Sequence, residues 1–297
     1  MTAAPDPATV EQLIQFGAAE FDRAGLWFGH GSDNPLDEAA ELVFFAAGYS
    51  HEEAHKAYSR QLTHTQRQAA LILFDRRIRE RIPAAYLTHR MWFAGHEFYV
   101  DERVLVPRSP LAELIEAHFA PWIEAARITR VLDIGTGSGC IAIATALALP
   151  RANVDAADIS DDALAVAAIN VERHQLDRRV RLLRSDVFDG VAGERYDVIV
   201  ANPPYVGDDE MRGLPEEYRR EPRAGLHGGR DGLDIVRRIL AGAAERLRPQ
   251  GVLIVEVGNS DEALAQAFPH APFVWLEFER GGGGVFVLTA EQLAQLK

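Results

Sequence analysis

A chain of 297 residues, 47% of them apolar and 25% charged, has the composition of a globular protein with one large or two smaller domains. Its net charge of −13 argues against a nucleic-acid binder that relies on phosphate contacts and suits a strongly basic protein partner. Its one cysteine excludes an internal disulfide and a cysteine-rich zinc site, and no apolar run could cross a bilayer or serve as a secretory signal, so we expect a cytoplasmic protein.

The first 88 residues predict a helical domain. Apolar residues recur with helical spacing in three stretches, at 10–21, 36–47 and 70–78. Asn34 is expected to cap the second helix, with Pro35 at its first position. Four arginines between 76 and 81 are interpreted as a solvated helix face. The loop before the cap carries three large side chains that we expect to be exposed and available to a partner: Trp27, Phe28 and His30.

The pattern changes between residues 83 and 107. Short aromatic and β-branched runs at 86–88, 91–93, 97–100 and 104–106 predict a β-hairpin linker over residues 89–107. A helix is expected from about Pro107 to residue 126. The rest of a second domain, residues 108–297, alternates strands with helices. This alternation predicts an α/β fold with a doubly wound, seven-stranded, Rossmann-like sheet. Its last two strands, near 273–278 and 284–288, should pair antiparallel because only a short glycine-rich turn joins them.

The buried strand expected at 197–201 ends in the tetrapeptide Asn202-Pro203-Pro204-Tyr205. The prolines stiffen this loop, which follows the carboxyl end of a strand, where open α/β sheets bind ligands. We therefore interpret Asn202, Pro203, Pro204 and Tyr205 as catalytic. The Asn202 side chain and the Pro203 carbonyl would accept the N–H groups of a planar amide or amino group, with the Tyr205 ring on its plane. The alternative is a tight turn with an aromatic lid.

A cofactor site is expected after the strand at 130–134, which runs into the turn Gly135-Thr136-Gly137-Ser138-Gly139. The G-x-G-x-G spacing differs from that of dinucleotide sites, and Asp133 repels phosphate, so the turn suits the cation S-adenosylmethionine. Asp158 ends the next strand, where a carboxylate accepts from ribose hydroxyls. Asp186 follows the third strand and could accept from the adenine amino group. The residues expected to bind S-adenosylmethionine are Asp133, Gly135, Thr136, Gly137, Ser138, Gly139, Asp158, Ile159, Asp186, Val187 and Asn202.

Each of these residues also has a structural interpretation. Asp158 could cap the following helix, although Ser160 could fill that role instead, and Asp186 could be a turn residue. Cys140 is interpreted as a small residue packed at a helix start, without a catalytic role. No metal site is expected. Without any family resemblance, the glycine turn, the carboxylates and the 202–205 tetrapeptide together indicate a methyltransferase that acts on a planar nitrogen.

The motifs at 133–140 and 202–205 resemble those of the HemK-type glutamine N5-methyltransferases, and the resemblance covers nearly the whole chain. The stretches 28–34, 92–110 and 256–260 are similar to the PrmB branch, which modifies large-subunit ribosomal protein L-three. The branch that modifies the GGQ glutamine of release factors usually has Arg-Pro-Glu-Thr where this chain has Arg108-Ser109-Pro110-Leu111.

The resemblance implies methyl transfer from S-adenosylmethionine to a glutamine of ribosomal protein L-three, either free or in an assembling subunit. The helical domain at 1–88 would then select this partner, because the catalytic motifs lie within residues 108–297. Sequence-specific nucleic-acid binding is not expected. Three other interpretations stay open: glutamine methylation of release factors, adenine-N6 methylation of nucleic acid, and a non-catalytic adaptor that binds the ribosome.

Overall fold

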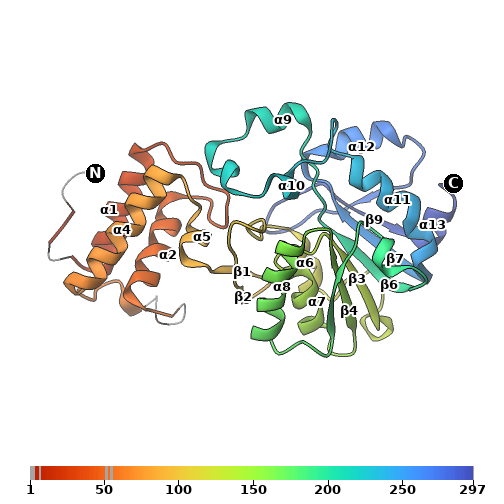
Figure 1. Ribbon diagram of the computed structural model, residues 1–297, viewed down its shortest axis with the longest axis horizontal. Coiled ribbons are helices and arrows are strands. Elements are labelled where there is room, and N and C mark those ends of the chain that lie inside the picture. The colour runs from red at the N-terminus through yellow and green to blue at the C-terminus, as the bar shows by residue number, and fades with distance from the viewer. Residues whose placement is uncertain (1–3, 7, 51–52, 54–55, 297) are drawn as a thin grey trace. The chain divides into compact units, whose positions relative to one another are not determined.

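The computed structural model of the protein describes residues 4–6, 8–50, 53 and 56–296 (Figure 1). The chain divides into two compact units. The helical unit comprises Met1–Met91 together with a second segment, Pro215–Arg220. The sheet unit comprises Trp92–Leu214 and Glu221–Lys297. No helix among the described residues is long and apolar enough to span a membrane.

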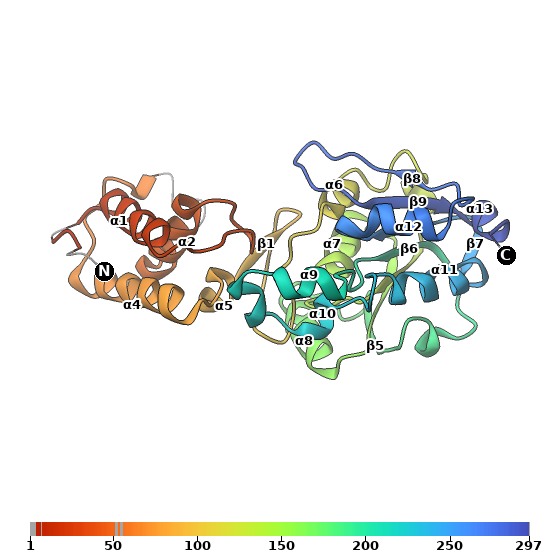
Figure 2. The ribbon, with the colours of Figure 1, turned by 90° about the horizontal axis from the view of Figure 1, so that it is seen from above.

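The helical unit has a core formed by three main helices that lie side by side (Figures 1 and 2). The helices whose bounds the structure describes in this unit include α1 (Val10–Arg23), α2 (Pro35–Ala47), α4 (His64–Glu80), α5 (Ala84–Thr88) and the short η3 (Glu216–Arg220). The core includes Leu13, Leu42 and Phe74, in agreement with the helical spacing of the sequence. The expected cap is confirmed, since Asn34 Oδ1 accepts a hydrogen bond from the Asp37 amide.

Three expectations for this unit are wrong. Arg77 does not lie on a solvated face: its side chain is 1% exposed and forms an ion pair with Glu38. His30 is 5% exposed, and its ring centroid lies 4.5 Å from that of Tyr218. Phe28 is only partly exposed and packs against the core of the unit. Helical periodicity treats a polar side chain such as Arg77 as exposed, whereas a paired one can be buried, and a place in a loop did not show that His30 and Phe28 pack inward. Trp27 is 51% exposed, as expected.

The predicted hairpin is present but shorter than its aromatic runs suggested. It consists of β1 (Met91–Phe93) and β2 (His96–Phe98), joined by Ala94 and Gly95, which both have positive φ. The run at 86–88 belongs to helix α5, and the run at 104–106 forms no strand. In the second case the Val106 amide donates to the Glu221 carboxylate and so has no sheet partner.

The helix expected up to residue 126 ends much earlier. Helix α6 spans only Leu111–Glu116, and a separate turn, η1, covers Ala125–Arg127. His118 and Phe119 have φ values of 54° and 63°, which are incompatible with a continuing right-handed helix. Pro121, without an N–H group, follows them. Phe119 and Ile123 of this stretch are nevertheless buried in the core of the sheet unit.

The sheet unit contains the predicted seven-stranded sheet, in the order β5-β4-β3-β6-β7-β9-β8. Its strands are β3 (Arg130–Ile134), β4 (Asn153–Asp158), β5 (Val180–Arg184), β6 (Tyr196–Ala201), β7 (Leu247–Glu256), β8 (Val274–Trp275) and β9 (Val285–Thr289). Strands β3 to β7 are parallel. Strand β9 runs antiparallel to both β7 and β8, which confirms the prediction for the end of the chain.

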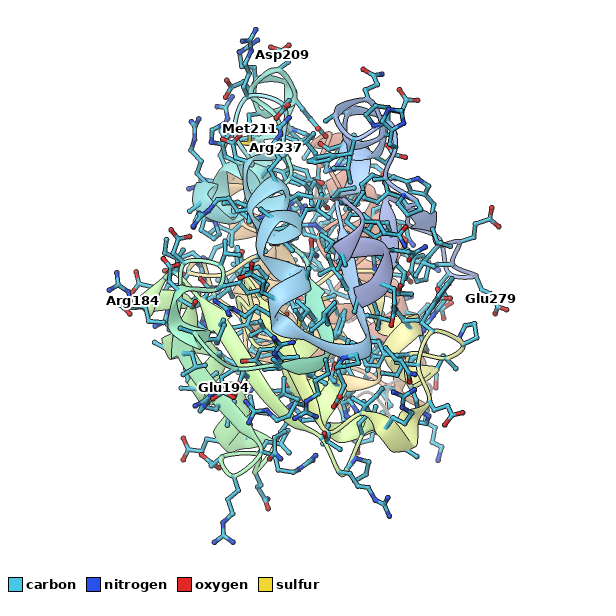
Figure 3. The ribbon with its side chains drawn as sticks, turned by 90° about the vertical axis from the view of Figure 1, so that its right-hand side faces the viewer. Arg184, Glu194, Asp209, Met211, Arg237 and Glu279 are labelled. Atoms are coloured by element: carbon cyan, nitrogen blue, oxygen red, sulfur yellow. The ribbon has the colours of Figure 1, made fainter. Side chains whose placement is uncertain are left out.

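Helices cover both faces of this sheet, because alternate residues of each buried strand point to opposite sides. Helices α6, α7 (Cys140–Ala148) and α8 (Asp161–Arg173) contribute to one core. Helices α11 (Asp234–Arg246), α12 (Asp261–Ala267) and α13 (Ala290–Ala294) contribute to the other. Figure 3 shows α11 and α13 in front of the strands. Two short helices, α9 (Asp208–Gly213) and α10 (Arg223–Leu226), follow β6.

Candidate active site

The loops that carry the predicted site residues follow four neighbouring strands, β5, β4, β3 and β6. At the ends of these strands Ile134 pairs with both Ala157 and Ala201. The glycine turn, Asp158 and Asn202 therefore emerge at one edge of the sheet. A Cβ atom on Gly135 would lie 3.7 Å from the Asn202 carbonyl oxygen, so the glycine turn and the 202–205 loop are adjacent.

The glycine turn needs its glycines for backbone shape and for close packing. Gly135, Gly137 and Gly139 have φ values of 74°, 55° and 81°, in the left-handed region that favours glycine. A Cβ atom on Gly139 would lie 3.3 Å from Ala167 of α8, so the start of α7 packs closely on that helix. The Gly135 amide donates to the Ala157 carbonyl, 2.9 Å away, which ties the turn to β4.

Asp133, at the end of β3, is fully buried beneath this turn. Burial raises the pKa of its carboxyl group to about 7, with a further increase from the charge of Asp158. The Thr136 hydroxyl donates to Oδ2 at 2.6 Å, whereas Oδ1 has no hydrogen-bond partner of normal geometry among the described residues. A buried acceptor without a partner is costly, and a cationic ligand with N–H groups would satisfy it.

Asp158, at the end of β4, is held by two backbone amides. Its Oδ2 accepts from Gly137 and its Oδ1 from Ser160, both at 2.9 Å. Ser160 caps helix α8 by accepting from the Ala163 amide, so the helix cap considered for Asp158 falls to Ser160. Burial raises the pKa of Asp158. The carboxylate is thus fixed in orientation and linked directly to the glycine turn.

The third loop contains Asp186 and Val187. Asp186 already has a partner, since Arg238 Nη1 of α11 donates to its Oδ1 at 2.8 Å. Val187 is buried with a φ of 55°, an uncommon conformation for a β-branched residue. Beside Asp158, Ile159 leaves 57% of its surface exposed although it is a large apolar residue. An apolar ring bound at this edge would cover that surface.

The 202–205 loop leaves β6 with the Asn202 side chain half-buried and without a hydrogen-bond partner among the described residues. Its amide group is therefore available to a ligand. The loop backbone is fixed beyond this point. The Val206 amide donates to the Leu226 carbonyl at 2.8 Å, and the Gly228 amide donates to the Val206 carbonyl at 2.9 Å.

Three glycines that the sequence analysis did not single out surround this loop. A Cβ atom on Gly228 would lie 2.5 Å from the Pro204 carbonyl oxygen, and one on Gly232 would lie 2.1 Å from that of Tyr205. At Gly258 a Cβ atom would meet the Tyr205 ring at 2.5 Å. The loop thus fits into a cradle that only glycine permits. Ser260 Oγ also donates to the Tyr205 carbonyl at 2.8 Å.

Sequence reasoning also missed the Glu256 carboxylate, which contacts the Tyr205 hydroxyl. The Tyr205 hydroxyl donates to Glu256 Oε1 at 3.3 Å, and the Ser109 hydroxyl donates to Glu256 Oε2 at 2.5 Å. Glu256 ends β7 and is buried, which raises the pKa of its carboxyl group to about 7. The hydrogen bonds from Ser109 and Tyr205 and the charge of Arg108 partly offset this increase in pKa. The motifs at 108–110 and 256–260 were noted only for their resemblance to a family, and the structure connects both to Tyr205.

Cys140, the first residue of α7, is buried, and burial raises the pKa of its thiol to about 12. The thiol is therefore protonated at neutral pH and is a poor nucleophile. This environment agrees with its interpretation as a packing residue.

Comparisons with known proteins point to one family. The model of the methyltransferase small domain matches residues 117–214. A ribosomal protein uL3 glutamine methyltransferase from Xanthomonas campestris is 49% identical, covering 98% of this chain and 94% of the relative. A protein with the same name from Neisseria meningitidis serogroup B is 46% identical, covering 98% of this chain and 96% of the relative.

Among solved structures, the hMettl16 catalytic domain in complex with MAT2A 3′UTR hairpin 1 is 19% identical with a TM-score of 0.48, covering 84% of this chain and 91% of that one. This likeness is too low to bear on function. The two methyltransferases that match almost end to end are the informative relatives.

Proposed function

The chain belongs to the family of ribosomal protein uL3 glutamine methyltransferases, and on that premise we propose that it methylates the side-chain amide nitrogen (N5) of a glutamine in ribosomal protein uL3. S-adenosylmethionine is the proposed methyl donor. The observation that carries the proposal is the proximity of two loops: the turn above Asp133, which suits a cation, lies against the 202–205 loop, which suits a planar amide.

The residues of the sheet edge fit S-adenosylmethionine in their chemistry. When bound, this cofactor supplies an electrophilic methyl group on a positively charged sulfur. The partnerless Oδ1 atom of Asp133 would accept from its amino group, and Asp158 would accept from its ribose hydroxyls. Ile159 and Val187 supply apolar surface for adenine. Asp186 could accept from the adenine amino group only by sharing the carboxylate with Arg238.

The 202–205 loop would orient the substrate amide. Its nitrogen is a poor nucleophile because the lone pair is delocalised into the carbonyl group. The Asn202 side-chain oxygen and the Pro203 carbonyl would hold the two N–H groups, and the Tyr205 ring would fix the amide plane. Both hydrogen bonds strengthen as the nitrogen becomes positive, so they stabilise the transition state more than the ground state. Orientation then supplies most of the rate enhancement.

The helical unit is proposed to recognise the substrate, with the hairpin as the linker to the methyltransferase domain. Its exposed Trp27 and the acidic charge of the chain suit a basic ribosomal protein. A cytoplasmic location is part of this proposal, because the acceptor is a ribosomal protein. Free uL3 and an assembling subunit are both possible acceptors under it.

Methyl transfer to purified acceptors tests the proposal. The full chain with radiolabelled S-adenosylmethionine should label uL3 and leave a release factor and RNA unlabelled. Mass spectrometry should place one methyl group on a glutamine of uL3, and ribosomes from cells that lack the chain should lack that group. Labelling of the release factor or of RNA in place of uL3 would refute the proposed substrate.

Titration calorimetry of Asp158→Ala tests the cofactor site. Loss of a charged acceptor should weaken S-adenosylmethionine binding by roughly 1–3 kcal/mol. Asp161→Ala is the matched control, since Asp161 lies in the same region but its side chain is 76% exposed. Equal affinities for the two variants would remove Asp158 from the cofactor site.

A further inference from the structure

The chain that leaves the 202–205 loop passes from one unit to the other and back. Helix α9 (Asp208–Gly213) belongs to the sheet unit and has no buried residue, and its Asp209 projects from the surface in Figure 3. The next segment, Pro215–Arg220, belongs to the helical unit. At Glu221 the chain is again part of the sheet unit. The proposed catalytic loop and the helical unit are therefore joined by a short covalent connection in addition to the one at the hairpin.

Within the helical unit, Glu217 lies in a buried ionic cluster. Its side chain is 2% exposed, and its Oε1 accepts from the Trp27 amide at 3.0 Å and from Arg81 Nη1 at 3.2 Å. Arg77 Nη1 lies 3.4 Å from the same oxygen. The Arg77 guanidinium also contacts Glu38 at 2.9 Å and 3.3 Å. Burial opposes ionisation of Glu217, but these hydrogen bonds and charges lower its pKa overall, so the carboxylate is charged at neutral pH.

Glu221 is held with similar strength within the sheet unit. Its side chain is fully buried. Arg108 binds it with both terminal nitrogens, at 2.6 Å and 2.7 Å, and the Val106 amide donates to it at 2.9 Å. The neighbour of Arg108 is Ser109, whose hydroxyl binds the Glu256 carboxylate that also contacts Tyr205. This end of the segment is thus connected to the catalytic loop through side chains as well as through the chain.

A buried carboxylate cannot leave its arginine partner without a large desolvation penalty. The chain is therefore fixed at Glu217, within the segment, and at Glu221, directly after it. We propose that Glu217 and Glu221 form a double anchor that sets the course of the chain after Tyr205, and that they are positioning residues for methyl transfer. This inference rests on the proposed function of the 202–205 loop. Its consequence is that turnover depends on both buried carboxylates.

A length change that leaves both anchors in place tests the double anchor. Insertion of Gly-Ser-Gly after Gly213 lengthens the connection at a point where a side chain would meet open space. The turnover number for uL3 should fall by about 10- to 100-fold, because small displacements of a positioning group cost this much. The affinity for S-adenosylmethionine and the melting temperature should be unchanged. The same insertion after Gly193, which also faces open space in the sheet unit, is the control and should leave turnover unchanged.

Two substitutions separate positioning from stability. Glu217→Gln and Glu38→Gln weaken the same buried cluster, but only Glu217 lies on the connecting segment. At comparable melting temperatures, Glu217→Gln should lower the turnover number further than Glu38→Gln, with similar KM values for uL3. Combined with the insertion, Glu217→Gln should cause little additional loss, since both changes act through one segment. Equal turnover in the two single variants, or a wild-type rate after the insertion, overturns the double anchor.

Amide hydrogen exchange tests the double anchor independently of the proposed substrate, because it does not require methyl transfer. If the wild-type chain transfers no methyl group to uL3, the proposed substrate fails, whatever the anchors do. The amides of Val206 and Gly228, which hold the loop at 2.8 Å and 2.9 Å, should still exchange faster in Glu217→Gln than in Glu38→Gln. Equal exchange in both variants counts against the double anchor alone.

Discussion

Three carboxyl groups at the edge of the sheet are poorly solvated. Burial raises the pKa values of Asp133 and Glu256 to about 7 and also raises that of Asp158. Two of them belong to the proposed cofactor site, and the third contacts Tyr205. Asn202 differs from all three, because it is half-buried and binds no other described residue. Under the proposed function, Asn202 would hold the substrate, whereas the three carboxyl groups would hold the cofactor or support the 202–205 loop.

Asn202→Ala should abolish most turnover and leave the affinity for S-adenosylmethionine within a few-fold of wild type. The loss of one preorganised polar contact raises the barrier by about 3 kcal/mol. Single-turnover methyl transfer and titration calorimetry measure the two effects. Asn153→Ala, an exposed position at the opposite end of β4, is the control. Turnover near the wild-type rate would show that Asn202 does not hold the acceptor.

Glu256→Gln should change how stability depends on pH. The folded-state pKa of Glu256 is raised, so the native state binds a proton more tightly than the unfolded state does. The resulting stabilisation is complete below the unfolded pKa and is lost as pH rises through about 7. Between about pH 5 and about pH 8, the free energy of unfolding should fall by roughly 1–3 kcal/mol more in wild type than in the variant.

Chemical denaturation at several pH values measures this difference. Asp133 and Asp158 also have raised pKa values, but they contribute equally to both proteins and cancel in the comparison. The groups that face Glu256 are Ser109, Tyr205 and the charge of Arg108. Parallel pH profiles for the two proteins would mean that Glu256 ionises normally in the folded state.

At the scale of elements, the 202–205 loop is held by its surroundings as much as by its prolines. Gly228, Gly232 and Gly258 approach its backbone and the Tyr205 ring too closely for any side chain. The loops after β6 and β7 are therefore closely packed against each other. The two strands that precede them are adjacent and parallel, which places both loops at the same edge.

Gly258→Ala should lower turnover by displacing Tyr205. The new Cβ atom would lie 2.5 Å from the ring, and the φ of 47° adds strain of about 1–2 kcal/mol. Gly193→Ala is the matched control: its φ is 82°, but a Cβ atom there meets nothing within 4 Å. Both variants should lose stability on thermal unfolding, whereas only Gly258→Ala should lose methyl transfer at unchanged cofactor affinity. A similar turnover in both would remove Tyr205 from the mechanism.

At the scale of the whole molecule, two units with separate cores have separate proposed tasks. The helical unit exposes Trp27, and two acidic residues that follow it in the chain, Asp33 and Asp37, are exposed as well. His30 and Glu38 are buried in this unit, so they are not accessible to a partner. A fragment that lacks residues 1–82 could test whether the helical unit recognises the substrate, but the deletion would leave Glu217 without Arg77 and Arg81. A point substitution in the full chain is therefore the cleaner test of recognition.

Trp27→Ala should weaken recognition of uL3 without affecting the cofactor. Exposed tryptophans are common anchors at interfaces, and the loss of one costs roughly 2 kcal/mol in binding. The KM for uL3 should rise at a constant affinity for S-adenosylmethionine. Trp275→Ala, an exposed tryptophan on the edge strand β8 of the sheet unit, is the control. An unchanged KM would place substrate recognition elsewhere.

The sequence by itself determined the alternation of strands and helices, the antiparallel end of the sheet and the Asn34 cap. It also determined that Asp133 and Asp158 lie at the ends of strands and that Asn202 directly follows one. These features are local, because hydrophobic periodicity and loop residues report the backbone conformation of a few neighbouring positions. The helix expected up to residue 126 shows the limit of such local signals. Buried apolar side chains can follow helical spacing without a helix.

Only the tertiary structure decided which distant residues meet. Ser109, Tyr205 and Glu256 come from three separate segments, and the Glu217 cluster joins residues on both sides of the catalytic loop in the chain. Local periodicity describes Arg77 and Glu217 as polar and therefore as exposed. Both side chains can be buried because their opposite charges form an ion pair. Such a pair between residues far apart in the sequence exists only once the chain has folded.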